Sequence, residues 1–397
     1  MVTPSSSDPK HPRLLSFTLD GWDVLGDRVS VTLSDGVAVL VGRNGAGKSA
    51  ILEGFKKISL YAIEVSGLFV HQSNYGESFP RILEIDILTP TNRKLNYKYE
   101  LLVAENEDIL DSIIYEERPF SWNDSCHYLD GQKEPVWTTL SGITTLSDRE
   151  SSTILGITSS VRQFNFPKQP QVDLPSEMEW IYSVLKGINL IRTNSSRGDA
   201  GRSFSSVRIS KKNVYFSPLN FSEVLSYKII QMNPEVVKEL SGICERVGLG
   251  KEIFIQKNDS GRGVESEFTS SISLDRVNIG LLSDGALRVL SILIGLIDSH
   301  LSKTTIIEEP EAQIHPAMIE KILNEIEAYT YGDNLLLSTH SPQVVAWTSP
   351  GKLNLVHRTD GKTIVRKLKE DEIQNVVNFL SEEGSLGEWL YSGIVDE

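Results

Sequence analysis

Cysteine is scarce in this sequence, which holds only Cys126 and Cys244 among 397 residues. Two cysteines make neither a disulfide framework nor a cysteine-based metal cluster, so we expect a cytoplasmic protein in a reducing compartment. The opening stretch, MVTPSSSDPKHP, has no apolar core behind a basic segment and is not expected to be a signal peptide. Its Ser and Pro content instead predicts a disordered tail over residues 1–12.

A long hydrophobic run is also missing. The most apolar segment, ALRVLSILIGLI, runs from Ala286 to Ile297 and includes Arg288. A membrane-spanning helix needs about 20 apolar residues, so this segment predicts a buried helix and a protein without a membrane partner. Heptad patterns and internal repeats are absent as well, which excludes a long coiled coil and a repeat architecture.

Positive charge is in deficit, because the formal net charge is −14. A global basic field for nucleic acid is therefore excluded, and DNA or RNA binding would need a local basic patch. One candidate is the segment 191–213, which contains one acidic residue, Asp199, and six basic residues: Arg192, Arg197, Arg202, Arg208, Lys211 and Lys212. Two interpretations stay open for it, a solvated basic loop and a nucleic-acid contact.

What the sequence does contain is a glycine-rich turn between a strand and a helix. The apolar run VAVLV at residues 37–41 predicts a strand, and SAILEGFKKISL at 49–60 has helical spacing with Ile51, Leu52, Phe55 and Ile58 on one face. Between them lies GRNGAGKS, of the form Gly42-x-x-x-x-Gly47-Lys48-Ser49. This is the phosphate-loop pattern of nucleotide-binding proteins.

Each part of this loop has a chemical reason. The glycines let backbone N–H groups turn toward phosphate oxygens, and the helix adds its positive N-terminus. Lys48 is expected to neutralise the β- and γ-phosphates, while the Ser49 hydroxyl ligates Mg²⁺. The predicted nucleotide-binding residues of the loop are Gly42, Arg43, Asn44, Gly45, Ala46, Gly47, Lys48, Ser49 and Ala50.

Two further strand ends carry polar groups suited to nucleotide hydrolysis. The stretch TTIIEEPE ends a β-branched strand in Glu308, predicted to hold Mg²⁺, and Glu309, predicted to orient and polarise the attacking water. The stretch NLLLSTHSP ends a third strand in His340. A histidine at the carboxyl end of a parallel strand is well placed to sense a γ-phosphate. Glu309, His340 and Lys48 are thus the candidate catalytic residues.

The segment LLSDGALRVL places Ser283, Asp284 and Gly285 directly before the buried helix. Free N–H groups and a hydroxyl at a helix start bind anions, but the same residues also make an ordinary helix cap. From the residues alone, the cap is the better explanation.

Together, GRNGAGKS, LSDGALRVL, IIEEPEAQIHP and LLSTHSP resemble the ATP-binding-cassette-like ATPases of the SMC, RecF and OLD type. More narrowly, they resemble the AAA-family ATPases of prokaryotic defence loci. The resemblance implies an α/β P-loop ATPase fold with a mixed sheet, an antiparallel meander and a helical or irregular insertion. It also implies ATP and Mg²⁺ as cofactors and a homodimer or higher oligomer, in which Ser283 and Gly285 contact the γ-phosphate held by another subunit.

The sequence departs from the family pattern at several positions. Asp284 replaces a small residue, Glu308 stands where many members have Asp, and Gln313 stands where His is common. The family's glutamine-loop residue has two candidates, Gln72 and Gln163. The residues that contact adenine are not identified.

The expected domain order is a tail at 1–12, an ATPase lobe at 13–117 with the meander at 80–117, an insertion at 118–270 and a second ATPase lobe at 271–397. Irregular structure is expected over residues 120–215, apart from one helix in SEMEWIYSVLKGINLIR at 176–192. A further helix is expected in NPEVVKELSGICERVGL, with Asn233 as its cap before Pro234.

The first functional hypothesis is an ATP-dependent switch that controls a separately encoded nuclease or toxin in anti-phage defence. The alternative is a RecF- or SMC-like DNA-processing ATPase that binds nucleic acid through residues 191–213. A transporter subunit ranks lowest.

Overall fold

The computed structural model describes most of both ATPase lobes and part of the sequence between them. The described residues are 11–63, 80–103, 120–130, 136–140, 143–146, 176–192, 205–209, 214–218, 221–257, 270–298, 303–367 and 372. Residues 1–10 of the predicted tail, the candidates Gln72 and Gln163 and most of the basic segment lie outside these residues.

A seven-stranded antiparallel sheet lies at one end of the molecule, with strand order β2-β1-β4-β5-β6-β7-β8. Alternation along β4 buries Leu83, Ile85 and Ile87 on its inner face. The strands are β1 (Arg13–Asp20), β2 (Val29–Thr32), β4 (Ile82–Leu88), β5 (Lys94–Val103), β6 (Phe120–Tyr128), β7 (Trp137–Leu140) and β8 (Ile143–Leu146). Adjacent pairing of β4 and β5 confirms the first hairpin of the predicted meander.

The second sheet is mixed, with strand order β18-β17-β3-β16-β15-β9. All of its neighbouring pairs are parallel except β17 with β18. The strands are β3 (Val37–Val41), β9 (Asn189–Arg192), β15 (Thr304–Glu308), β16 (Asn334–Thr339), β17 (Leu353–Thr359) and β18 (Lys362–Lys367). β15 and β16 are buried almost throughout, as the apolar runs predict for a parallel sheet covered on both faces.

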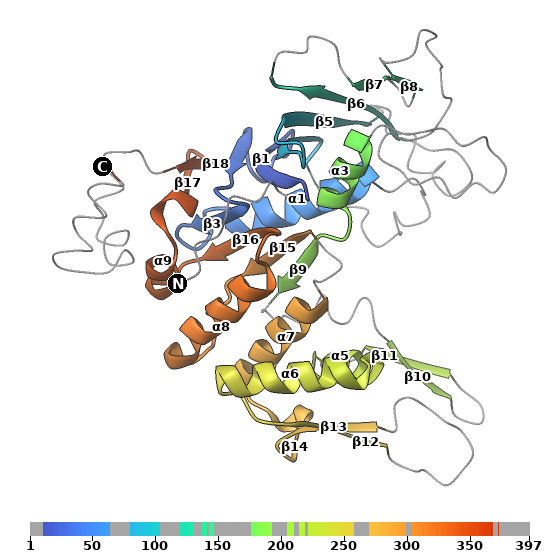
Figure 1. Cartoon of the computed structure of the whole chain (residues 1–397), viewed down its shortest axis with the longest axis vertical. Coiled ribbons are helices and arrows are strands. Elements are labelled where there is room, and N and C mark those ends of the chain that lie inside the picture. Colours follow the sequence, from blue (N-terminus) through green and yellow to red (C-terminus); the bar gives the residue numbers. More distant parts are fainter. Residues whose placement is uncertain are drawn as a thin grey trace.

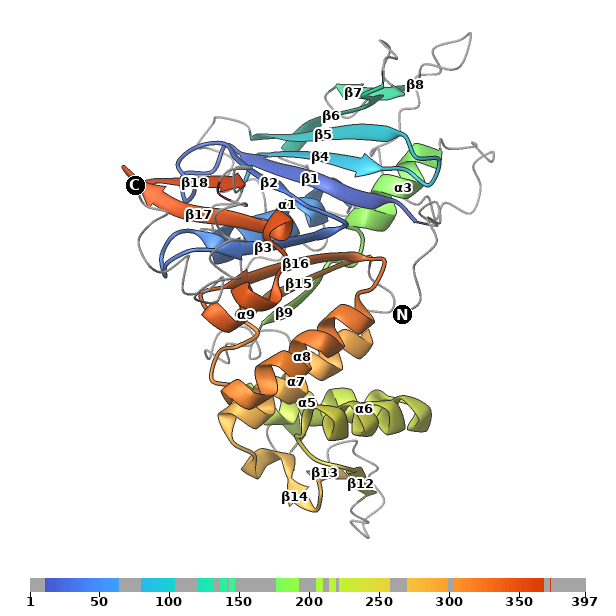
Figure 2. The ribbon, with the colours of Figure 1, turned by 60° about the vertical axis from the view of Figure 1, so that its left-hand side comes forward.

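Helix α1 (Lys48–Ile63) lies between the two sheets together with α3 (Ser176–Leu185), as Figures 1 and 2 show. The predicted apolar face of α1, with Ile51, Leu52, Phe55 and Ile58, is fully buried. Phe55 stacks on Phe17 of β1 with ring centroids 4.2 Å apart. One hydrophobic core thus joins the first sheet, both helices and one face of the second sheet.

A second core covers the other face of the mixed sheet, where Val39, Leu335 and Leu337 pack against helices. Beyond these helices lies a small antiparallel sheet (Figure 2). The helices are α5 (Phe221–Gln231), α6 (Pro234–Val247), α7 (Asp284–Asp298), α8 (Pro316–Tyr329) and α9 (Pro342–Trp347), and the small sheet has β12 (Ile253–Lys257), β13 (Ser270–Leu274) and β14 (Val277–Asn278). The predicted buried helix is α7, and the predicted cap of α6 is confirmed because Asn233 Oδ1 accepts from the Val236 N–H at 2.9 Å.

The prediction was wrong for the stretch between residues 176 and 192. A single helix was expected, but α3 ends at Leu185 and Gly187 has a φ of 65°, which turns the chain into β9. β9 then pairs in parallel with β15 at the edge of the mixed sheet. Residues 120–215, expected to be irregular, also contain β6 to β8 and the hairpin of β10 (Ser205–Ile209) and β11 (Val214–Pro218). For β9, pairing with the distant strand β15 overrides weak local propensity, whereas β7 with β8 and β10 with β11 are local hairpins.

None of the helices in the described part of the chain is long and apolar enough to cross a membrane.

The hairpin β17–β18 forms a floor under the turn between β3 and α1. A Cβ atom at Gly42 would stand 2.0 Å from the Val356 carbonyl oxygen, and one at Gly47 would stand 2.5 Å from Thr363 Oγ1. Thr363 also donates its hydroxyl to the Ala46 carbonyl at 3.3 Å. The glycines therefore serve close packing below the loop as well as its conformation.

Gly42→Ala should lower the melting temperature, because the clash with Val356 is with backbone that has no room to move. Overpacking of this kind costs about 1–3 kcal/mol, which corresponds to a few degrees for a domain of this size. Gly351→Ala is the matched control, since a Cβ there meets nothing within 4 Å and it lies next to the same hairpin. Calorimetry that finds equal melting temperatures for the two variants would contradict this close packing.

Candidate functional site

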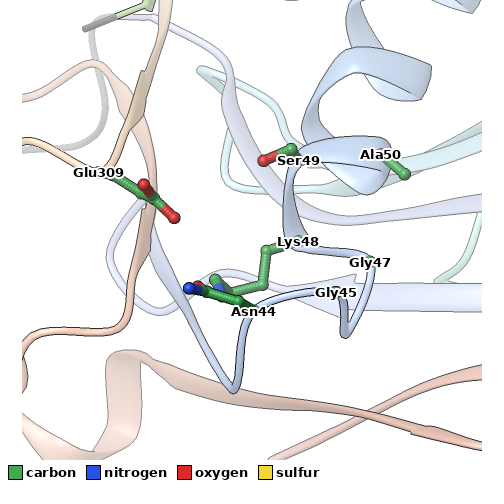
Figure 3. A pocket seen from close by; sticks show the side chains of 7 residues that line it. All are labelled: Asn44, Gly45, Gly47, Lys48, Ser49, Ala50 and Glu309. Carbon is green, nitrogen blue, oxygen red and sulfur yellow. The ribbon is translucent and has the colours of Figure 1, made fainter. Parts of the chain in front are cut away.

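The loop from Gly42 to Ala50 leaves β3 and wraps around the first turn of α1. Gly45 and Gly47 have φ angles of 83° and 107°, a region that glycine enters without strain. The loop lines a cavity of about 370 Å³, whose other wall is Glu309, as Figure 3 shows. A helix start with several inward N–H groups is a strong anion site. The geometry is therefore that of a phosphate cradle.

The Lys48 side chain lies inside this loop. Its Nζ donates to the carbonyl oxygens of Gly42 at 2.7 Å and Arg43 at 3.1 Å. Burial lowers the pKa of Lys48, and the negative charges of Glu309 and Glu311 partly oppose that effect. Among the described residues, the hydrogen-bond acceptors of Lys48 Nζ are neutral carbonyls, which are weaker partners for an ammonium group than charged phosphate oxygens. Phosphate oxygens would supply the stronger partners at this position.

Glu308 and Glu309 follow each other at the end of β15 but differ in placement. Glu308 is the last strand residue and pairs in register with Ser338 of β16. By strand alternation it shares the sheet face of Ile306, which is the face that α1 covers. Glu309 has a φ of 45°, so the chain leaves the strand sharply, and its N–H donates to the Ser338 carbonyl at 2.9 Å. The carboxylate of Glu309 points across the cavity toward Ser49 (Figure 3).

Ser49 and Glu308 supply oxygen donors of the kind that Mg²⁺ binds. The Ser49 hydroxyl lines the cavity at the start of α1, and Glu308 lies on the sheet face toward that helix. Mg²⁺ usually takes one or two protein oxygens and completes its shell with phosphates and water. Among the described residues, no cluster of three or more His, Cys, Asp or Glu side chains is arranged to hold a metal alone. The donor set fits a metal bound jointly with a nucleotide.

His340 lies directly after β16 and beside Glu309. Its Nδ1 is 3.4 Å from Glu309 Oε1 and 3.6 Å from Glu311 Oε1, and its side chain is 43% exposed. β16 lies between β3 and β15, so the parallel pairing brings the carboxyl ends of all three strands to one edge of the sheet. The structure thus brings together the loop, Glu309 and His340.

The sequence reasoning missed Glu311. Its side chain is only 6% exposed, and Oε1 accepts hydrogen bonds from Thr339 Oγ1 at 2.7 Å and from the His340 N–H at 3.1 Å. The one signal for Glu311 in the sequence was that it is the third carboxylate of EEPE. The hydrogen-bond partners of Glu311 are Thr339 and His340, which are 28 and 29 residues further along the chain, so only the folded structure shows the contacts.

The segment Ser283–Gly285 does not line the cavity of the loop. Ser283 Oγ accepts from the Ala286 N–H at 3.3 Å, which makes it a cap of α7. These residues border a second cavity of about 430 Å³, lined by Leu249, Ser283, Asp284, Gly285, Ala286, Val289, Gln313, Ile314, His315 and Met318. The phosphate loop and this segment therefore belong to two separate cavities within one chain.

The two cavities are nevertheless linked through the turn that follows β15. A Cβ atom at Gly285 would stand 2.5 Å from the Gln313 carbonyl oxygen, so the start of α7 packs closely on this turn. Arg288 of α7 donates from Nη1 to the Ala312 carbonyl at 3.1 Å. Gly285 consequently has a packing role of its own, which the sequence did not indicate.

Comparison with known proteins places the chain in a family. The sequence profile of the family described as "AAA domain, putative AbiEii toxin, Type IV TA system" matches residues 37–346. No curated protein matches the chain. The phosphate loop and the ends of β3, β15 and β16 all fall within the matched residues.

Solved structures with a similar arrangement include heads of SMC proteins. One is an Smc head bound to the C-terminal winged-helix domain of ScpA, at 15% identity and a TM-score of 0.46, covering 91% of this chain and 99% of that one. An Smc head with an extended coiled coil, bound to the C-terminal domain of ScpA from Pyrococcus furiosus, has 12% identity and a TM-score of 0.43, covering 94% and 100%. The SMC head domain from Thermotoga maritima has 14% identity and a TM-score of 0.39, covering 90% and 99%.

The family profile spans well over half of the chain. The chain therefore belongs to the family described as "AAA domain, putative AbiEii toxin, Type IV TA system", as a P-loop AAA ATPase.

Proposed function

We propose that this protein binds and hydrolyses ATP with Mg²⁺, closes as a homodimer around the nucleotide, and thereby switches a separately encoded effector. One observation carries the proposal: the Glu309 carboxylate faces Ser49 across the cavity that the phosphate loop lines. A carboxylate opposite a phosphate cradle is where hydrolysis needs a group that orients water. The same cavity includes Lys48, the cation for the phosphates.

Each residue then has a task toward the triphosphate. The loop N–H groups bind phosphate oxygens, and Lys48 exchanges its bonds to the Gly42 and Arg43 carbonyls for bonds to phosphate. Glu309 orients and polarises the attacking water, and His340, 3.4 Å from Glu309, stands where the terminal phosphate is sensed. Ser49 and Glu308 would hold Mg²⁺, which neutralises charge on the phosphates when bound.

The separation of the two cavities supports the proposed dimer. In one chain Ser283 and Gly285 border a cavity other than the one with Lys48, so each chain holds two different half-sites. A two-fold axis can place the segment of one copy over the phosphate loop of the other, and the isologous contact then forms two complete sites. The capped start of α7 offers N–H groups to the terminal phosphate there.

Control of an effector rests on the family description, which names a putative toxin and a type IV toxin–antitoxin system. We infer that the closed dimer restrains or releases a nuclease or toxin encoded elsewhere, in defence against phage. Slow hydrolysis suits such a switch, because the lifetime of the closed state sets the duration of the signal.

Lys48→Ala should weaken ATP binding by roughly a hundredfold, because charge-assisted bonds to phosphate contribute about 3 kcal/mol. Titration calorimetry with ATP and Mg²⁺ measures the effect. Lys362→Ala is the control, since that lysine pairs with Asp27 at an exposed position on the hairpin below the loop. Unchanged ATP affinity in Lys48→Ala would remove the assignment of the phosphate loop.

Glu309→Gln should keep ATP binding but lower kcat by on the order of a hundredfold or more, because the amide cannot act as a base. The variant should accumulate as an ATP-dependent dimer in size-exclusion chromatography with light scattering. Adding Ser283→Arg should abolish that dimer while each chain still binds ATP through its own phosphate loop, since Ser283 lies outside the loop cavity of its own chain. A dimer that persists in the double variant contradicts the head-to-head arrangement.

Expression of the protein together with the neighbouring open reading frame should protect cells from phage. The protection should be lost with Lys48→Ala, because a switch without bound nucleotide cannot close. Plaque counts measure it, and Lys362→Ala should protect like the wild type. Equal protection by Lys48→Ala would show that ATP binding is not part of the defence.

A further inference from the structure

The side chain of Glu311 is the best-buried carboxylate that contacts the candidate catalytic residues. It lies two residues after Glu309 in a tight turn, where the Ala312 N–H donates to the Glu309 carbonyl at 3.0 Å and the Ile314 N–H donates to the Glu311 carbonyl at 3.1 Å. This turn brings the Glu311 side chain to Thr339 at the end of β16. The function proposed above gives Glu311 no role.

One oxygen of this carboxylate fixes the backbone around His340. Oε1 accepts from Thr339 Oγ1 at 2.7 Å and from the His340 N–H at 3.1 Å. Thr339 Oγ1 in turn accepts from the Ser341 N–H at 2.9 Å, and Ser341 Oγ caps α9. The chain from Thr339 to Ser341 is therefore tied to one atom of Glu311. His340 itself projects from the middle of this tied segment.

The imidazole of His340 has few other constraints. It is 43% exposed, and its Nδ1 lies 3.6 Å from the same Oε1 of Glu311 and 3.4 Å from Glu309 Oε1. Because its position relative to Glu309 depends on the backbone that carries it, loss of the Glu311 bonds would let the pair separate. A displacement of about 1 Å in such a pair is enough to lower a rate by on the order of a hundredfold.

We propose that Glu311 is a positioning residue of the hydrolytic site, which acts by holding the backbone of His340 so that the imidazole stays beside Glu309. The proposal rests on the proposed ATP hydrolysis for its kinetic consequence, but not for the hydrogen bonds themselves. In this role Oε1 acts as a hydrogen-bond acceptor, and the negative charge of Glu311 is not required. Oε2 is buried and has no hydrogen-bond partner among the described residues, so an amide in its place would remove none of these bonds.

The first test does not need hydrolysis. Hydrogen–deuterium exchange of the full chain without nucleotide should show the His340 and Ser341 amides exchanging roughly fivefold faster in Glu311→Ala, the effect of losing a hydrogen bond worth about 1 kcal/mol. Amides of Leu336 and Leu337 within β16 should not change. Glu311→Gln should exchange like the wild type. Unchanged exchange at His340 and Ser341 in Glu311→Ala overturns the proposal, whatever the protein does to ATP.

The second test is a double-mutant cycle on kcat. Glu311→Ala and His340→Ala should each lower kcat by roughly tenfold or more with little change in KM, and the double variant should be no slower than His340→Ala alone. Glu311→Gln should retain kcat within about threefold, because its amide oxygen accepts the same bonds. Multiplied losses in the double variant would show that Glu311 acts independently of His340.

Two further variants separate positioning from stability. Glu325→Ala removes a partly buried glutamate of α8 that accepts two bonds from Arg246 and does not line the cavity of the phosphate loop, and should lower the melting temperature without changing kcat or the His340 amide. If Glu311→Ala does not fold, Thr339→Val replaces it, because it breaks the links to Glu311 and Ser341 with a side chain of equal shape. Wild-type kcat and Ser341 exchange in Thr339→Val would then overturn the proposal.

Discussion

The parallel pairing of β3, β16 and β15 is the constraint on which the candidate site depends. Val41 pairs with Thr339, and Ser338 pairs with Glu308, so the three strands end at the same level. Everything that follows a strand end, namely the phosphate loop, Glu309 and His340, is thereby placed along one edge of the sheet. A shift of one residue in either pair would turn these side chains to opposite faces. The two buried cores on either side of the sheet hold this register.

The site concentrates charge in little space. Lys48 is buried and donates to the loop carbonyls of Gly42 and Arg43, while Glu309 and Glu311 carry the opposing charge nearby. Buried charges are tolerated where partners are fixed in advance, and here the partners come from the loop and from the turn after β15.

The turn after β15 connects the two cavities. Its first residue is Glu309, its Ala312 carbonyl accepts from Arg288 of α7, and its Gln313 carbonyl packs on Gly285. Gln313 and Glu309 both have positive φ values, which marks the turn as conformationally demanding. In the proposed dimer, a contact that moves the start of α7 therefore acts on the same turn that carries Glu309. This gives a direct route between assembly and hydrolysis within one chain.

The sequence alone determined the parts with strong local signals: the phosphate loop, the carboxylates at the end of β15, His340 after β16, the buried helix α7 and the cap of α6. Each depends on chemistry or periodicity within a few residues. Only the tertiary structure decided that Glu311 ties down His340, that β9 is a strand, and that β17 and β18 form the floor under Gly42 and Gly47. These features depend on pairing between residues far apart in the chain, which leaves no local pattern. The site residues could be predicted from the sequence because each follows the end of a strand. The contacts that support the site could not be predicted, because they join residues of different strands.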